Sequence, residues 1–331
     1  MVLGFRPEEN IGPGELTLSK VISVANPEFV RLIVGVTDNW QYVPLLHMGL
    51  IKGYEARFKS GKQKAFTDTG ALFGDVIEEH VRLMGVMELG GEGPSWFPHK
   101  GRFIEFSYRG KKIRLRGNIH VYGMLLTENF QKESQGWLQP KGKVVFDVGA
   151  YYGDTAIYFA LNGARHVYAF EPFPGACMLA RENLRLNHLA GKVDVIQQAV
   201  GGKAGRISVP RGGGGIGAVL GNKTGKDGAT VKGRVEARIT TLDEIVHRYH
   251  PHDAVLKMDT EGGEYETILK ASTEALRSFG RILIEYHYGY KNLEERLRRA
   301  GFKVWHTAPR FSRTGGEYKF SLVGTIYAER I

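Results

Sequence analysis

The sequence predicts an α/β fold in which a mostly parallel sheet is covered by helices on both faces and is preceded by a smaller α+β region. From residue 142 onward, short apolar runs typical of strands alternate with helical patterns. Before that point, helical patterns and paired strands are mixed without this alternation. With 331 residues, the chain is long enough for more than one domain. We therefore expect an accessory region over residues 1–140 and an α/β domain over residues 141–331.

The α/β domain is expected to contain seven strands, and the close spacing of the last two fits a sheet whose final strand runs antiparallel. The predicted strands cover residues 144–148, 166–170, 193–198, 254–259, 281–286, 303–307 and 320–327. The predicted helices cover residues 154–161, 174–187, 242–249, 265–269 and 293–300. Residues 210–233 are rich in glycine and without periodicity, so they are expected to form a loop, either a surface insertion or a lid over the substrate.

The accessory region is expected to hold helices and two hairpins. Residues 39–51 predict a helix in part, and residues 54–59 with the run that follows predict a hairpin. Apolar residues spaced three and four apart predict an amphipathic helix over residues 71–86. A loop over residues 90–98 then precedes a second hairpin, which turns at Arg109-Gly110.

The composition limits the classes of protein to which this chain can belong. A net charge of +10 would suit an anionic partner such as nucleic acid, but basic enzymes with small-molecule substrates are common. The single cysteine, Cys177, excludes an intrachain disulfide framework and favours a reducing compartment. The first 20 residues lack the basic start and apolar run of a signal peptide, and no run reaches the roughly 18 apolar residues of a membrane span. We expect a soluble, cytoplasmic protein.

The connection after the first strand, VVFDVGAYYGD, has the composition of a cofactor loop. It carries Asp147, Gly149 and Gly153 just before a helix begins. A cofactor with an amino-acid tail and a ribose must lie against the backbone at the carboxyl end of this strand, where side chains must be small or absent. A dinucleotide site would instead need the pattern G-x-G-x-x-G, which this loop lacks. An ordinary tight turn between strand and helix is the alternative.

Glu171, at the end of the second strand, strengthens the cofactor prediction. An acid at this position can accept hydrogen bonds from both ribose hydroxyls. Its alternative role is that of a favourable charge at a helix N-terminus, since Pro172 and Pro174 open the next helix. Gln197 and Gln198, near the end of the third strand, could contact an adenine or serve the structure equally well, and we assign Gln198 to the cofactor.

A second group of polar residues follows the fourth strand in VLKMDTEGGEYE. Asp259 comes directly after an apolar strand, and Glu261 follows it, at the sheet edge where open α/β sheets bind ligands. A solvated helix start would explain Glu264 and Glu266. The next strand, LIEYHYG, adds a histidine to this edge.

The fifth strand places Glu285 and His287 on one face, because side chains two residues apart in a strand point the same way. A histidine and two acids from neighbouring strands can converge on one acceptor hydroxyl. A purely structural histidine is the alternative.

Taken together, DVGAYYGDTAIYFALNGA, VYAFEPFPGACMLARENLRLN, ITTLDEI, LKMDTEGGEYETIL and ILIEYHYG resemble the FkbM-type methyltransferases. The resemblance covers about residues 122–307, and K-x-D-x-E-G-x-E is its most specific motif. It implies a class I Rossmann-like fold, S-adenosylmethionine as the methyl donor, and O-methylation of a hydroxyl on a sugar, glycolipid or secondary metabolite.

The resemblance also implies roles for individual residues. The cofactor would be lined by four of them: Asp147, Gly149, Gly153 and Glu171. The reaction would be faced by three: Asp259, Glu261 and His287. The family usually has asparagine where this chain has Tyr151, which we also assign to the cofactor, and a tyrosine adopts a left-handed backbone poorly.

Our mechanistic hypothesis is that His287 or Asp259 acts as general base, while Glu261 orients it or binds the acceptor. A divalent metal held by Asp259, Glu285 and His287 is a lesser alternative, and no metal site is predicted.

Two other functions remain as alternatives. The basic residues at 111–116 and 296–299 raise the possibility of an RNA methyltransferase, but no recognisable RNA-binding module or NPPY motif is present, so nucleic acid is not the favoured partner. A non-catalytic binding protein on the same scaffold is the second alternative. The acceptor and the oligomeric state are left open by the sequence.

Overall fold

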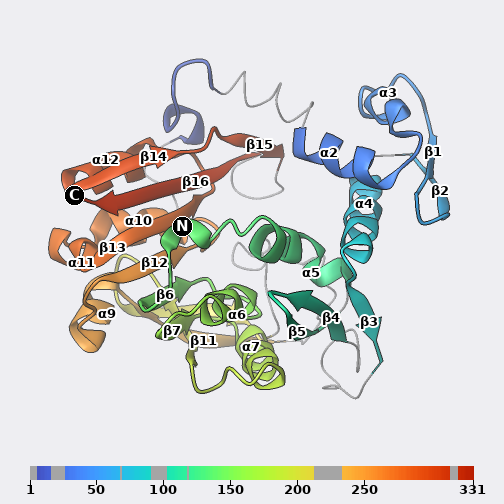
Figure 1. The fold of residues 1–331 in the computed structure, drawn as a ribbon. Helices are drawn as coiled ribbons and strands as arrows, with labels where there is room; N and C mark the ends of the chain where they lie inside the picture. The colour runs from blue at the N-terminus through green and yellow to red at the C-terminus, as the bar shows by residue number, and fades with distance from the viewer. Residues whose placement is uncertain are drawn as a thin grey trace. The chain divides into compact units, whose positions relative to one another are not determined.

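The computed structural model describes residues 6–15, 27–67, 69–90, 103–117, 119–211, 233–313 and 320–331. Contacts divide the chain into two compact units (Figure 1). The larger unit contains residues 6–15 and the described residues from Glu133 to the C-terminus. The smaller unit contains the described residues between 27 and 132.

The smaller unit combines short helices with two antiparallel sheets. Its helices are α2 (Pro27–Val36), η2 (Trp40–Tyr42), α3 (Val43–His47), α4 (Thr69–Leu83), α5 (Ile119–Leu126) and the π-helix η3 (Thr127–Gln131). Its strands are β1 (Tyr54–Arg57), β2 (Gln63–Phe66), β3 (Met87–Leu89), β4 (Phe103–Tyr108) and β5 (Lys111–Arg116). The hairpins β1–β2 and β4–β5 and the helix α4 confirm the sequence predictions, whereas α2 and α5 were not predicted. Most of the loop predicted over residues 90–98 lies outside the described residues.

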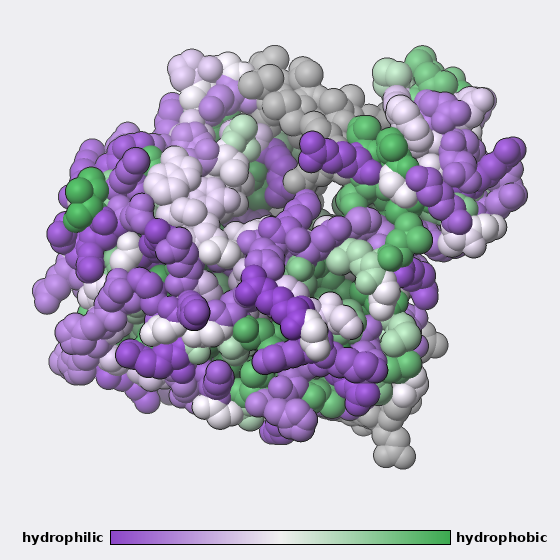
Figure 2. All heavy atoms as spheres, in the orientation of Figure 1, coloured by the Kyte–Doolittle hydropathy of each residue, from purple (hydrophilic) through white to green (hydrophobic). Residues whose placement is uncertain are grey.

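A hydrophobic cluster holds one part of this unit together. It joins Ile33 and Val36 of α2, Phe58 and Phe66 of the first hairpin, and Leu72 of α4, among others. Hydrophobic side chains are also visible on the surface around α2, α3 and α4, while hydrophilic ones cover most of the visible face of the larger unit (Figure 2).

The larger unit is built on an eight-stranded, mostly parallel sheet. Its strands are β6 (Val144–Val148), β7 (His166–Phe170), β8 (Val193–Ile196), β12 (Ala254–Met258), β13 (Phe279–Tyr286), β14 (Phe302–His306), β15 (Arg310–Arg313) and β16 (Phe320–Arg330). The order across the sheet is β14-β16-β13-β12-β6-β7-β8, and β15 pairs with β16 off this path. β16 runs antiparallel to both β13 and β14, so the antiparallel final strand is confirmed. This is the class I methyltransferase arrangement of an α/β sheet.

The larger unit has helices before and between the strands of this sheet. They are η1 (Pro7–Glu9), η4 (Gly136–Leu138), α6 (Asp154–Leu161), α7 (Pro174–Leu186), α9 (Leu242–Tyr249), α10 (Gly263–Lys270), α11 (Thr273–Arg277) and α12 (Lys291–Arg299). All five residues of β12 are buried because the central strands are covered on both faces. Thr241 caps α9, since its Oγ1 accepts a hydrogen bond from the Glu244 amide at 3.1 Å. Among the described residues, no helix is both long and apolar enough to cross a membrane.

The sequence prediction was wrong for the third strand. Instead of one strand over residues 193–198, β8 ends at Ile196 and a new strand, β9 (Gln198–Val200), joins a separate three-stranded sheet. In that sheet β9 runs parallel to β11 (Arg234–Thr240), which pairs antiparallel with β10 (Gly205–Pro210). The partner of β9, β11, lies about 40 residues further along the chain, so local patterns did not reveal the pairing. Most of the predicted loop at 210–233 lies outside the described residues.

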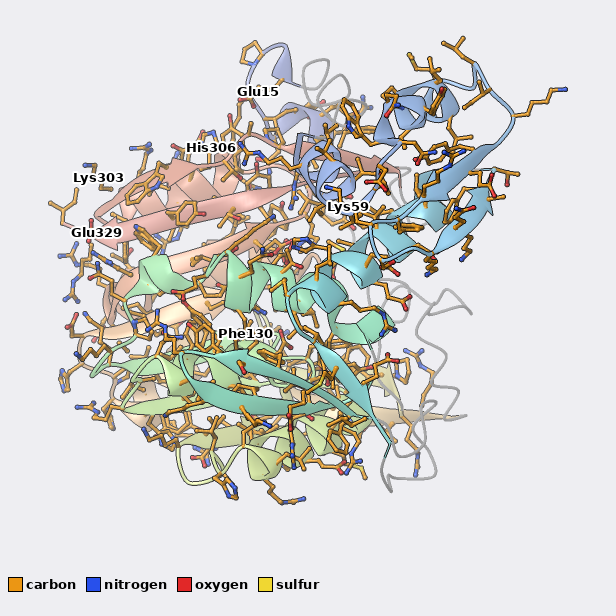
Figure 3. All side chains as sticks on the ribbon, turned by 45° about the vertical axis from the view of Figure 1, so that its right-hand side comes forward. Glu15, Lys59, Phe130, Lys303, His306 and Glu329 are labelled. Carbon is orange, nitrogen blue, oxygen red and sulfur yellow. The ribbon has the colours of Figure 1, made fainter. Side chains whose placement is uncertain are left out.

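The N-terminal segment is tied to the connection between β13 and α12. The buried Asn10 donates from Nδ2 to the Tyr288 carbonyl at 3.1 Å, and its own carbonyl accepts the Tyr290 amide at 2.9 Å. Glu15 accepts a hydrogen bond from the Tyr290 hydroxyl at 2.8 Å, and the Tyr290 ring stacks on His306 at 3.5 Å between centroids. Glu15 and His306 are both labelled in the upper part of the view in Figure 3. The sequence prediction had placed residues 6–15 with the accessory region.

Candidate active site

The glycine loop after β6 requires glycine at its first position. Gly149 has a φ of +79°, and a Cβ added there would lie 1.7 Å from the Asp259 carbonyl oxygen. The amides of Gly149 and Ala150 both donate to the Phe170 carbonyl, at 2.9 and 3.1 Å. Gly153 also has a positive φ, of +81°, immediately before α6. The loop therefore brings the carboxyl ends of β6, β7 and β12 into backbone contact.

Glu171 is fixed by the backbone of the same loop. Its Oε2 accepts the Tyr151 amide and its Oε1 accepts the Phe173 amide, each at 3.0 Å. The side chain is buried, and burial raises the pKa of Glu171 to about 7, against these two hydrogen bonds that lower it. The structure thus holds a carboxylate beside the glycine loop.

Tyr151 adopts the left-handed backbone that its residue type disfavours, with a φ of +45°. Its ring stacks on that of Tyr152 at 3.7 Å between centroids. Strained residues of this kind persist where the surrounding contacts determine the backbone, and they gather at functional sites. Here the bond from the Tyr151 amide to Glu171 is one of those contacts.

Lys257, near the carboxyl end of β12, is a site residue that the sequence analysis missed. Its side chain is only 4% exposed, and its ammonium donates to the Gly149 carbonyl at 3.0 Å. It also lies 3.5 Å from Asp147 Oδ1 and 3.9 Å from Asp259 Oδ2. Burial opposes the charge, but the carboxylates, Asp147 foremost, raise the pKa of Lys257. The signal was present in the sequence, because a lysine inside an apolar strand needs a partner.

Asp147 is fully buried at the end of this network. Its Oδ2 accepts a hydrogen bond from the Thr155 hydroxyl at 2.6 Å, while Oδ1 faces Lys257. Gln198 begins β9, where its backbone pairs with Arg238 in the small sheet. The five other residues assigned to the cofactor lie within the loop after β6 and at the ends of β6 and β7, and Gln198 belongs to a different sheet.

The three residues assigned to the reaction come together. His287, which follows β13, has its Nε2 3.0 Å from Glu261 Oε2 and 3.9 Å from Asp259 Oδ1. The imidazole is 5% exposed, while the two carboxylates, in the connection between β12 and α10, are about one-third exposed. Glu261 has a left-handed backbone, with a φ of +56°. The arrangement can hold an acceptor hydroxyl, take up a proton or bind a cation.

The interpretation of Glu264 as part of a solvated helix start was wrong. Its side chain is fully buried. One oxygen accepts the Thr260 hydroxyl at 3.0 Å and the Gly262 amide at 2.8 Å. The other lies 3.1 Å from His287 Nδ1 and accepts the His287 amide at 3.2 Å. Although burial opposes it, the carboxylates of Glu264 and Glu261 raise the pKa of His287 well above its ordinary value. Glu264 therefore positions the imidazole.

Among the described residues, the acids and histidine that could share a cation are Asp259, Glu261 and His287. The alternative set considered from the sequence had Glu285 in the place of Glu261. The difference arises because Glu261 follows the end of β12 in a left-handed turn, which strand periodicity does not describe.

Two sequence matches with known proteins concern methyltransferases. Residues 147–304 match the family model described as the methyltransferase FkbM domain. A ribosomal protein L11 methyltransferase from Carboxydothermus hydrogenoformans is 42% identical over 78 residues, a stretch that spans 24% of this chain and 24% of that protein.

The solved structures that this chain matches include two methyltransferases with bound ligands. TrmK from M. capricolum, in complex with S-adenosylhomocysteine, is 13% identical with a TM-score of 0.37, over 61% of this chain and 69% of that one. Magnesium protoporphyrin IX methyltransferase from Synechocystis, with bound S-adenosylmethionine, is 13% identical with a TM-score of 0.32, over 60% and 77%. The resemblance found in the sequence is confirmed by the family match, which covers residues 147–304.

Proposed function

We propose that the protein transfers the methyl group of S-adenosylmethionine to a hydroxyl oxygen of a sugar, glycolipid or secondary metabolite. The observation that carries this proposal is the cluster of Asp259, Glu261 and His287 at the carboxyl ends of β12 and β13. Asp259, a member of this cluster, is also the residue whose backbone carbonyl meets Gly149 of the glycine loop. Donor and acceptor would therefore lie side by side. The FkbM match supports the reaction class.

The cofactor would lie on the glycine loop. Gly149 and Gly153 offer backbone without side chains on either side of Tyr151, and Glu171, which accepts the Tyr151 amide, offers a carboxylate to the ribose hydroxyls. Asp147 would act on the amino-acid tail indirectly, because it is fully buried and its partners are Thr155 and Lys257. Lys257 would stiffen the loop through the Gly149 carbonyl.

The methyl group of a sulfonium is already activated, so the protein must align the two reactants and remove a proton. The acceptor oxygen attacks the methyl carbon, and the carbon–sulfur bond breaks with its electron pair moving to sulfur, which gives S-adenosylhomocysteine. The hydroxyl proton leaves to the cluster formed by Asp259, Glu261 and His287. Glu264 would keep the imidazole in place during this step.

The test is to incubate the purified protein with methyl-labelled S-adenosylmethionine and fractionated cell extract. Label entering a glycan, lipid or small-molecule fraction as an alkali-stable ether is the expected result. Label in RNA would instead indicate an RNA methyltransferase. Cofactor binding without transfer to any fraction would indicate a non-catalytic protein. Asp259→Asn and His287→Gln should abolish transfer while cofactor binding persists.

A further inference from the structure

We propose that Asp259, Glu261 and His287 bind a divalent metal ion of the magnesium or manganese class, which holds the acceptor hydroxyl at the reaction centre. One ligand atom from each of the three residues lies within 4.8 Å of the other two. The inference rests on the proposed function and names what would bind the acceptor in the same site.

Two buried oxygens of the cluster have no hydrogen-bond donor. Asp259 Oδ1 and Glu261 Oε2 are inaccessible to solvent and accept no hydrogen bond from the described residues. Leaving such an oxygen without a donor destabilises the fold, and more so when the oxygen carries charge. Both oxygens face His287 Nε2, at 3.9 and 3.0 Å, as ion-pair partners of the imidazole when it is protonated. A cation between the three atoms would satisfy both oxygens.

His287 is oriented as a metal-binding histidine is. Such histidines usually donate the proton of the second ring nitrogen to a carboxylate, which fixes the ring and its tautomer. Here Nδ1 lies 3.1 Å from Glu264 Oε1, and Glu264 is itself held by the Thr260 hydroxyl and the Gly262 amide. This arrangement turns Nε2 toward Asp259 Oδ1 and Glu261 Oε2.

The spacing of the ligand atoms suits a small cation. Neighbouring ligands on an octahedral ion, at about 2.1 Å from it, are separated by about 3 Å. Glu261 Oε2 and His287 Nε2 are 3.0 Å apart, and Asp259 Oδ1 would close in from 3.9 Å. Two carboxylates and one imidazole, with no thiolate, favour magnesium or manganese and leave other positions for water and the acceptor oxygen. A hydroxyl bound to such an ion loses its proton more readily.

The experiment measures manganese binding directly. The full-length protein is stripped with a chelator and titrated with Mn²⁺, and free Mn²⁺ is followed by electron paramagnetic resonance. We expect one Mn²⁺ per chain, and at least tenfold weaker binding in Glu261→Gln and in Asp259→Asn. Glu266→Gln is the matched control, because this acid in α10 pairs with Lys270 at 3.6 Å, and it should bind as the wild type does. Thermal unfolding and binding of labelled S-adenosylmethionine show that each variant is folded.

Several results would overturn the metal site, and another would refute the proposed function. No Mn²⁺ bound by the wild type at 1 mM added metal, or equal binding by the wild type and both cluster variants, would overturn the metal site. Full methyl transfer in excess chelator would also overturn it and would leave the proposed methyltransferase activity intact. Failure of the wild type to bind S-adenosylmethionine, with Mn²⁺ still bound, would instead refute the proposed function.

Discussion

Glu171 should make the protein less stable as the pH rises, and Glu171→Gln should remove that dependence. Burial raises the pKa of this carboxyl from 4.5 to about 7 in the folded protein. The protonated acid therefore favours folding, and its contribution is complete below pH 4.5 and is lost as the pH rises through 7. The difference between these two pKa values corresponds to a loss of about 3 kcal/mol by pH 8.

The glutamine variant separates this effect from the hydrogen bonds. Its amide nitrogen replaces one of the two oxygens that accept the Tyr151 and Phe173 amides, at a cost of about 1–3 kcal/mol at every pH. The variant has no titrating carboxyl at this position, so the pH-dependent contribution of Glu171 to the free energy of unfolding is absent. The free energy of unfolding of the variant, relative to the wild type, should therefore rise by about 2.5 kcal/mol from pH 5 to pH 8.

Urea unfolding at four pH values between 5 and 8 measures this difference. Glu295→Gln is the control, since Glu295 lies on the surface and pairs only loosely with Arg299 at 3.4 Å, and its offset should be small and constant. An offset for Glu171→Gln that is the same at pH 5 and pH 8 would refute the reasoning.

The affinity for the cofactor should increase as the pH rises, whereas the stability of the folded protein should decrease. Hydrogen bonds to a charged acceptor contribute about 1.5–3 kcal/mol, so Glu171→Gln should weaken binding of S-adenosylmethionine at least tenfold at pH 8. The affinity of the wild type should fall as the pH drops below 7. Calorimetry gives both numbers, and unchanged affinity in the variant would remove Glu171 from the cofactor site.

Three further predictions concern the contacts around the loop and the cluster. Gly149→Ala places a methyl group 1.7 Å from a backbone carbonyl and should destabilise the protein by about 3 kcal/mol or more in urea, whereas Gly191→Ala, with open space around it, should be tolerated. Lys257→Met leaves Asp147 without its cation and should cost about 3–5 kcal/mol in the same assay, with a loss below 1 kcal/mol counting against the network. Glu264→Gln should lower label transfer at least tenfold with cofactor affinity within twofold, and a parallel loss of affinity would show that Glu264 does not act through His287.

The sequence alone determined the type of fold and the edge of the sheet at which the chemistry lies. Strand and helix patterns are local, so the alternation after residue 142 predicted the strands of the central sheet and the helices between them. The need for glycine at position 149 was also visible, although the sequence did not reveal that the obstacle is the Asp259 carbonyl. Because the carboxyl ends of parallel strands meet at one edge, Asp259 and His287 could be placed together before their distance was known.

Only the tertiary structure decided which side chains complete the site. Lys257 donates to the carbonyl of Gly149, 108 positions earlier in the chain, and the buried Glu264 contacts a histidine 23 positions later. Strand periodicity had suggested Glu285 as a candidate cation ligand. The left-handed turn at Glu261 instead brings Glu261 next to Asp259 and His287. The strand β9 likewise pairs outside the main sheet, with β11 about 40 residues further along the chain. These features depend on contacts between distant segments, and local propensity carries no information about such contacts.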